Sequence, residues 1–130
     1  AADQLVGADL PLSTDRHNEL VRLLDPLTDL AECHFRLDRL EQAERFARRG
    51  VAVGRRYWES KGYASSGQIA AGDGPCRLWL ARVAMARQAW PEADVHIAHA
   101  RVLADRGSHS EDHRQVTAVA AELERLRAGR

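Results

Sequence analysis

Hydrophobic residues recur along this chain every three or four positions, which is the spacing of helices that bury one face. Five stretches follow this pattern, at about residues 20–37, 41–59, 75–88, 91–107 and 110–128. No stretch alternates hydrophobic and polar residues over the length of a strand, and the abundant Ala, Leu, Arg and Glu favour helices. The sequence therefore predicts an all-α fold of about five helices, stacked as antiparallel hairpins in a single domain over 1–130.

Proline and glycine mark the expected ends of these helices. Pro26 interrupts the first stretch, which is therefore either two helices or one kinked helix. Pro91 suits the first turn of the fourth helix, and Gly107 suits its C-terminal end. Clusters of Gly, Ser and Pro elsewhere predict irregular structure, as a lead-in at 1–12 and a loop at 60–75.

Small residues recur at equivalent places in two successive helix pairs. The equivalent positions, 50 residues apart (31 to 81), are Ala31, Ala43 and Gly50 in the first pair and Ala81, Ala93 and Ala100 in the second. Side chains of this size let two helices approach each other closely. The pattern resembles the tetratricopeptide repeat, in its long-period bacterial variety, over about 27–58 and 77–106, with a half-repeat at 113–127.

The resemblance implies a fragment of an α-α superhelix, in which the first helix of each pair lines a concave groove that binds a protein or peptide. The chain departs from the family's pattern at three positions, in its period and in lacking the proline that often closes a repeat. Arg77 stands where the family has a large apolar residue. His34 and Ala84 stand where the family usually has an aromatic residue, and the offset of 50 residues (31 to 81) exceeds the family's period of about 34.

The resemblance also indicates which side chains face that groove, namely those between the packing positions of each first helix. An aromatic ring, a Met and several Arg in a groove suit a peptide with an apolar anchor and an acidic end. The alternative is that these residues are ordinary solvated or inter-helix side chains. The expected groove residues are Thr28, Glu32, Phe35, Arg36, Leu78, Arg82, Met85, Arg114 and Arg125.

Charge and composition limit the classes of partner that we expect. The formal net charge is zero, from 19 basic and 19 acidic residues, so we expect no nucleic-acid partner and no membrane surface. No apolar run reaches the length of a membrane span, and Cys33 and Cys76 alone make no disulfide framework, so a cytoplasmic location is expected. We expect a protein or peptide partner, with an acidic one favoured by the arginines. Homo-oligomerisation through the exposed ends of the repeat array stays open.

Histidine spacing raises a metal site as an alternative. His96 and His99 are three residues apart, and His109 and His113 are four apart, which are spacings that zinc sites use. No further ligand pair stands at a fixed spacing from either. We therefore expect an interfacial histidine at 96, surface histidines at 109 and 113, and no metal or cofactor.

No group of residues predicts catalysis. No glycine-rich phosphate loop follows a strand, and the adjacent Cys33 and His34 point about 100° apart on a helix, so they do not form a nucleophile–base pair. The sequence predicts a non-enzymatic protein- or peptide-binding scaffold, as the interaction or sensor segment of a larger bacterial regulator. The alternative is a helical domain that senses a small molecule or a metal.

Overall fold

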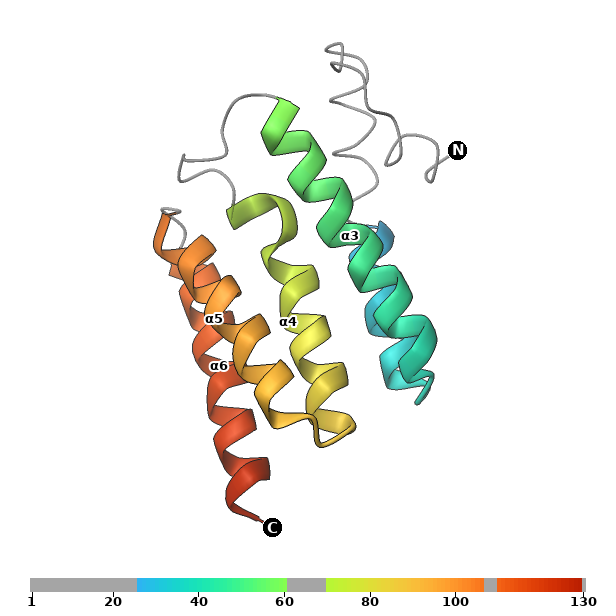
Figure 1. Cartoon of the computed structure of the whole chain (residues 1–130), viewed down its shortest axis with the longest axis vertical. Helices are drawn as coiled ribbons and strands as arrows, with labels where there is room; N and C mark the ends of the chain where they lie inside the picture. The colour runs from blue at the N-terminus through green and yellow to red at the C-terminus, as the bar shows by residue number, and fades with distance from the viewer. Residues whose placement is uncertain (1–25, 61–69, 107–109, 130) are drawn as a thin grey trace.

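The computed structural model describes residues 26–60, 70–106 and 110–129 (Figure 1). All regular structure within these ranges is helical and none of it is a strand, which confirms the expected all-α fold. The lead-in expected at 1–12 lies outside the described residues. The five described helices are one over 26–36, α3 (Leu40–Ser60), α4 (Ala70–Ala86), α5 (Trp90–Arg106) and α6 (Ser110–Ala128).

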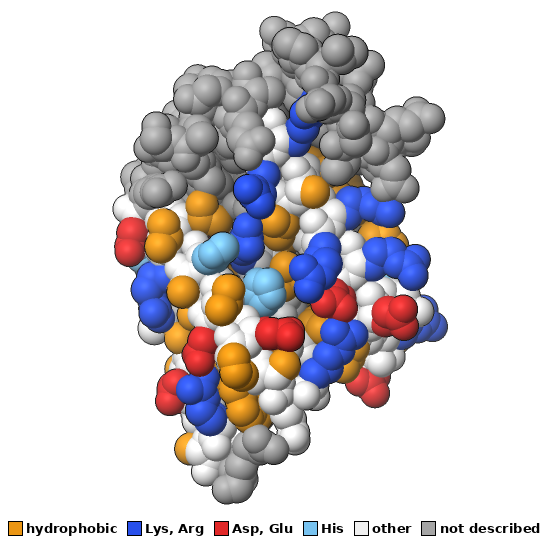
Figure 2. All heavy atoms as spheres, viewed as in Figure 1, with side chains coloured by type: hydrophobic (Ala, Val, Ile, Leu, Met, Phe, Trp, Pro, Cys, Tyr) orange, Lys and Arg blue, Asp and Glu red, His pale blue; other side chains and the backbone are white. Residues whose placement is uncertain are grey.

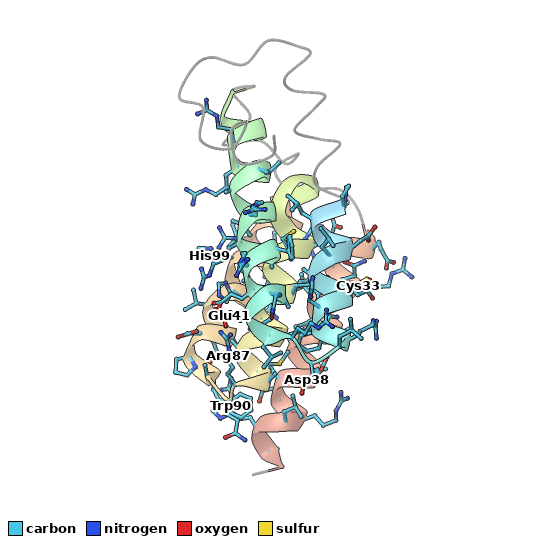
Figure 3. The ribbon with its side chains drawn as sticks, turned by 90° about the vertical axis from the view of Figure 1, so that its right-hand side faces the viewer. Cys33, Asp38, Glu41, Arg87, Trp90 and His99 are labelled. Atoms are coloured by element: carbon cyan, nitrogen blue, oxygen red, sulfur yellow. The ribbon has the colours of Figure 1, made fainter. Side chains whose placement is uncertain are left out.

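The helices form two hairpins followed by a single helix. The 26–36 helix and α3 make the first hairpin, and α4 and α5 make the second. Figures 1 and 3 together show α3 and α5 on one side and the 26–36 helix and α6 on the other, with α4 between them. Contacts run from α3 to α4, from α4 to α5 and from α5 to α6, and α4 also contacts α6. None of these helices is long and apolar enough to cross a membrane.

Both hairpins turn through the same backbone hydrogen bonds. The N–H of Asp38 donates to the carbonyl three residues earlier (3.0 Å), and the next N–H donates to the carbonyl five residues earlier (2.8 Å). Gln88 and its successor make the same pair of bonds, at 3.0 and 2.8 Å. This pair of bonds closes a helix that is followed, just beyond its end, by a residue in the left-handed conformation. Figure 3 places Asp38, Arg87 and Trp90 at one end of the molecule, so the two turns lie at the same end.

The small residues that repeat between the two pairs are buried where helices meet. Gly50 of α3 faces Cys76 of α4, and a Cβ atom at Gly50 would overlap the Cys76 sulfur. The glycine is therefore needed for the close approach of α3 and α4. The buried alanines at the shared positions, each at most 2% exposed, are Ala31, Ala43, Ala81, Ala93 and Ala100.

Two hydrophobic clusters form the core. The first joins α4, α5 and α6 and includes Leu78, Ile97 and Leu123. The second joins the 26–36 helix, α3 and α4 and includes Val51 and Leu80. Because α4 contributes to both clusters, it is the central helix, and burial on several sides explains its largely apolar sequence.

The expected loop at 60–75 is corrected by the structure, because α4 begins at Ala70 and α3 extends to Ser60. Residues 61–69 lie outside the described residues. Pro75 stands in the second turn of α4, where the missing N–H removes one helical hydrogen bond. Figure 1 shows the first turn of α4 lying at an angle to the rest of the helix, as expected for a helix that contains proline.

Candidate functional site

An open cleft of about 900 Å³ lies along the side of the molecule formed by the 26–36 helix, α4 and α6. These are the first helices of the two hairpins and the single helix that follows them. Each of the three contributes side chains to the walls. The lining residues are Thr28, Glu32, Phe35, Arg36, Pro75, Leu78, Trp79, Arg82, Gln115 and Glu122.

Aromatic rings form part of the cleft wall between the 26–36 helix and α4. The rings of Phe35 and Trp79 are tilted at 55°, with centroids 5.5 Å apart. The guanidinium of Arg82 lies over the Trp79 ring, 4.3 Å from its centroid. A cation at that distance is attracted by the ring's negative face. The three side chains therefore combine an apolar surface with a fixed positive charge.

Arg82 carries its charge without a hydrogen-bonded carboxylate. It makes no hydrogen bond or ion pair with the part of the chain that the structure describes, and its guanidinium stacks on Trp79. Burial lowers the pKa of Arg82, with Arg36 adding to that effect while Glu122 and Glu32 oppose it. The guanidinium stays protonated at neutral pH nonetheless. Its N–H donors are available to an acceptor that enters the cleft.

Arg36, the second arginine of the cleft, is already paired. Its Nε and Nη2 both donate to Oε2 of Glu32, at 3.0 and 2.7 Å. Both side chains are well exposed, so this pair adds little to stability. Because Glu32 neutralises Arg36, Arg82 is the cleft arginine whose donors a carboxylate of a partner can engage more readily.

A polar contact joins a residue of the cleft wall on the 26–36 helix to a buried residue of α4. The Thr28 hydroxyl and the buried Cys76 thiol lie 3.2 Å apart, and either atom can donate the hydrogen bond. Thr28 is half-buried and also lines the cleft. The contact fixes the 26–36 helix against α4 at the point where α4 faces Gly50 of α3.

Six of the nine expected groove residues line the cleft, and three do not. Met85 is 3% exposed and belongs to the cluster that joins α4, α5 and α6. Arg114 and Arg125 are exposed on the face of α6 opposite its core residues, such as Val119. The six that line the cleft are Thr28, Glu32, Phe35, Arg36, Leu78 and Arg82.

The sequence reasoning missed four cleft residues. Pro75 and Trp79 precede Arg82 by seven and three positions, so they share its face of α4, and helical spacing could have identified them. Gln115 and Glu122 are seven residues apart, so they share one face of α6. Arg114 and Arg125, which the sequence reasoning chose, lie on a different face of the same helix. The missing information was the rotation of α6 about its own axis.

The histidines form no metal site in the described ranges, where no group of three or more His, Cys, Asp or Glu side chains could hold an ion. His96 is half-buried, and its Nδ1 has no hydrogen-bond partner among the described residues. Burial lowers the pKa of His96, and Arg77 and Arg48 lower it further. His113 Nδ1 lies 3.6 Å from Asp105 Oδ1, while His109 lies outside the described residues.

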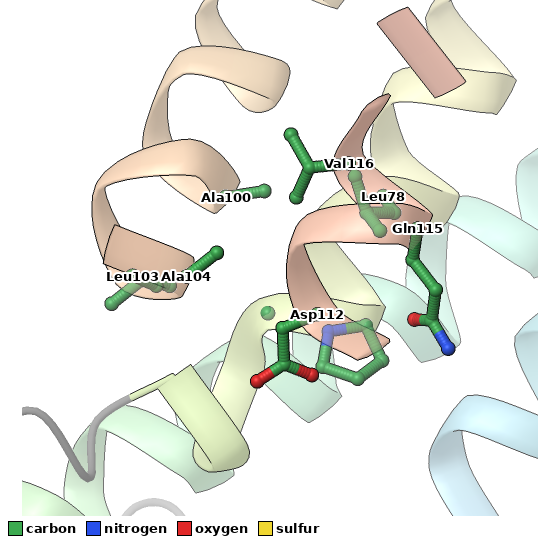
Figure 4. Close-up of a pocket in the computed structure, with 9 residues that line it drawn as sticks. Leu78, Ala100, Leu103, Ala104, Asp112, Gln115 and Val116 are labelled. Carbon is green, nitrogen blue, oxygen red and sulfur yellow. The ribbon is translucent and has the colours of Figure 1, made fainter. Parts of the chain in front are cut away.

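A small cavity lies between α4, α5 and α6 near the start of α6 (Figure 4). Its volume is about 10 Å³, which accommodates one water molecule at most. Asp112 lines it, and the Asp112 Oδ2 atom is buried without a hydrogen-bond partner in the described part of the chain. A space of this size is too small for a metabolite, so the cleft is the better candidate for ligand binding.

Comparisons with protein-family models, with curated proteins and with solved structures find no match to this chain.

Proposed function

We propose that this chain binds a protein or peptide partner in the cleft, with an apolar side chain of the partner against Phe35 and Trp79 and a carboxylate on Arg82. The observation that carries the proposal is Arg82, a half-buried guanidinium stacked on Trp79 with no carboxylate bonded to it. Arginine forms strong, directional bonds with carboxylates, and those bonds are stronger beside a surface that excludes water.

The shape of the cleft supports a peptide rather than a compact metabolite. Its volume of about 900 Å³ is at the upper end for small-molecule sites, and it is open along three helices instead of enclosed. An aromatic pair beside an arginine is the kind of surface at which a few residues supply most of the binding energy. The partner class we propose is therefore a peptide segment with a large apolar residue near an acidic residue or a free C-terminal carboxylate.

The hairpin arrangement supports this proposal as well. In tetratricopeptide-like arrays the first helices line the binding surface, and here the 26–36 helix, α4 and α6 occupy that side of the molecule. As part of the same proposal, the chain serves as the interaction segment of a larger bacterial regulator in the cytoplasm and has no catalytic step of its own.

The test is selection from a peptide library followed by calorimetry. Peptides selected on the full chain should contain an aromatic or large aliphatic residue next to Asp, Glu or a free C-terminus. The substitution Arg82→Gln should weaken their binding by about tenfold or more, because it removes the charge-assisted bond. The matched control Arg114→Gln removes an equal charge from the far face of α6 and should change the affinity less than twofold.

Two results would contradict the proposal. If the selected peptides lack acidic groups and bind equally well to Arg82→Gln, Arg82 does not bind a carboxylate of the partner. If a Trp79→Ala variant, with its fold verified by circular dichroism, keeps wild-type affinity, Trp79 does not contact an apolar side chain of the partner. The affinity should also fall as salt increases, because the proposed contact is partly ionic.

A further inference from the structure

The outer face of α5 carries a row of exposed apolar residues that no described helix covers. Pro91, Val95, Ala98 and Val102 follow one another at spacings of four, three and four residues. Val95 is 54% exposed and Val102 is 48% exposed. At about 100° per residue this row lies opposite the face that carries Ile97 into the core. The spacing is that of a helix that packs against another helix along a narrow seam.

Charged residues flank this apolar row on both sides in a self-complementary order. Asp94 and Arg101 lie seven residues apart along one side, and Glu92 and His99 lie seven apart along the other. Figure 2 shows hydrophobic side chains running along α5 on this face, with charged and histidine side chains to either side. Each flank therefore has an acidic group near the start of the helix and a basic or protonatable group further along it.

We propose that a second copy of this chain covers the row with its own α5, running antiparallel. In that arrangement Val95 lies opposite the partner's Ala98, and Pro91 lies opposite the partner's Val102. Asp94 then faces the partner's Arg101, and by the two-fold symmetry Arg101 faces the partner's Asp94.

The other flank obeys the same symmetry, since Glu92 faces the partner's His99 and His99 faces the partner's Glu92. In a parallel pairing, the flank with Asp94 and Arg101 would meet the flank with Glu92 and His99 of the other copy. Arg101 would then lie apart from Asp94 of the other copy. Antiparallel pairing is thus the arrangement that places Asp94 beside the other copy's Arg101 on one flank and Glu92 beside an imidazole that can donate a hydrogen bond on the other.

Asp94 can serve both within one copy and between two copies. Its Oδ1 accepts a hydrogen bond from Arg127 Nη2 at 2.8 Å, and its side chain remains 55% exposed. A carboxylate has acceptor capacity for several donors, so the partner's Arg101 can bind beside Arg127. The existing bond holds the carboxylate in place at the edge of the row.

The contact is modest in extent. Helix α5 has 17 residues and is about 25 Å long. A shallow hollow of about 300 Å³ beside the row, lined in part by Arg48, Glu92 and Val95, extends the surface towards α3. An interface of this length falls near the lower limit of stable ones, about 1,200 Å² in total. The dimer should therefore be reversible, and its population should depend on the protein concentration.

The dimer would present two clefts. None of the residues that line the cleft belongs to α5, so pairing through the row leaves each cleft open. A partner with two binding segments could then engage both clefts and gain avidity. The dimer itself rests on α5 alone, and its test does not depend on the function proposed for the cleft.

Sedimentation velocity of the full chain over a range from 1 to about 500 µM tests the proposal. The wild-type chain should shift from monomer to dimer as its concentration rises. Val95→Asp with Val102→Asp should remain monomeric, and since both positions are exposed, its helical content should stay unchanged. The matched control Leu37→Asp alters a side chain that is 61% exposed elsewhere, and it should dimerise like the wild type. A chain that stays monomeric throughout, or a dimer unaffected by the two substitutions on α5, overturns the proposal.

Charge exchange and crosslinking test the antiparallel arrangement. Asp94→Arg and Arg101→Asp should each weaken dimerisation by about tenfold, and the double variant should recover part of that loss, because the pairs between copies reform in reverse while the bond from Arg127 stays lost. Cysteines at positions 91 and 102, introduced in a Cys33→Ser background, should link two copies, whereas Val102→Cys alone should not, since antiparallel pairing separates the two copies of that position by about 16 Å along the axis. Crosslinking by Val102→Cys alone indicates parallel pairing and overturns the arrangement.

Discussion

Asp38 and Gln88 occupy the same place in the two hairpin turns, and both hold a left-handed backbone, with φ of 61° and 60°. They lie 50 positions apart (38 to 88), the same offset that relates the buried alanines 31 and 81. The repeat therefore extends to the backbone conformation of the turns. The left-handed region disfavours residues with a Cβ atom, and glycine is the usual residue at such a helix end.

Replacing Asp38 with glycine should stabilise the protein. Glycine removes the steric conflict of the left-handed conformation, while it makes the unfolded chain somewhat more flexible, so the net gain should be about 0.5–1 kcal/mol. Urea denaturation of Asp38→Gly and wild type measures the difference. Arg39→Gly, next to it in the same turn, is the control and should destabilise slightly, because its backbone is not left-handed. A loss of stability in Asp38→Gly would contradict the interpretation of the turn.

Gly50 provides a second prediction, because alanine at this helical position should destabilise the protein. The Cβ atom would overlap the Cys76 sulfur, and the buried Cys76 has little room to move. Overpacking typically costs about 1–3 kcal/mol, and the better helix propensity of alanine offsets about 1 kcal/mol of it. Thermal and urea unfolding should therefore show a net loss of about 1–2 kcal/mol.

The control for this prediction is Gly74→Ala in α4. A Cβ atom there meets nothing within 4 Å beyond its chain neighbours, and the better helix propensity of alanine is offset by the restriction that Pro75 places on the residue before it, so the substitution should change stability by less than about 1 kcal/mol. Adding Cys76→Ala to Gly50→Ala should recover part of the loss, since the overlapping sulfur is gone. Equal effects of alanine at Gly50 and Gly74 would show that the α3–α4 contact is not close.

The sequence predicted much of this fold because close packing and capping leave local signals. The buried alanines of both hairpins were recognisable as small residues at matching positions. The expected span of α6, from Ser110 to Ala128, agrees with the structure because a capping residue and acidic side chains mark its start. The start of α4 was missed, since Gly72, Gly74 and Pro75 are individually poor in helices and the packing of α4 between its neighbours overrides that preference.

The cleft was only partly predictable for a different reason. Spacing shows which residues share a helical face, but it does not show which way that face points once the helix is packed. Trp79 and Arg82 share a face of α4, so their neighbourhood follows from spacing alone. Whether Glu122 or Arg125 of α6 faces the cleft depends on how α6 is rotated about its axis against α4. That rotation is decided by contacts between residues that are distant in sequence.

Glu44 links the two hairpins and should contribute to stability. Its side chain accepts a hydrogen bond from Arg87 Nη1 at 2.9 Å across the α3–α4 boundary and another from Arg48 Nη2 at 2.9 Å. The bond from Arg87 is the main cause that lowers the pKa of Glu44, with burial opposing it and Arg48 adding to it. Glu44→Gln should cost about 1 kcal/mol, because the carboxylate is partly exposed.

The pH dependence of the Glu44 contribution follows from that lowered pKa. The contribution should be fully present above the unfolded pKa of about 4.5 and should be lost as the pH falls through the lower folded value. Urea unfolding at pH 7 and pH 3 measures this, and the wild type should lose its advantage over Glu44→Gln at the lower pH. The exposed Glu41→Gln is the control and should change stability by less than about 0.5 kcal/mol. An equal loss in both variants would show that the contact with Arg87 contributes nothing.

His96 should make the protein less stable as the pH falls through the histidine range. Its pKa is lowered below 6.5 by burial and by Arg77 and Arg48, with His99 adding to this and Glu92 opposing it. When the pH drops below 6.5 the unfolded chain binds the proton more readily than the folded chain does, so the free energy of unfolding falls until the folded pKa is reached and then levels off. NMR titration of the His96 ring should give a value below 6.5, and Arg48→Gln should raise it. Between pH 7.5 and 5, the free energy of unfolding should fall less in His96→Gln than in the wild type. If it falls equally in both, His96 is not the source of this pH dependence.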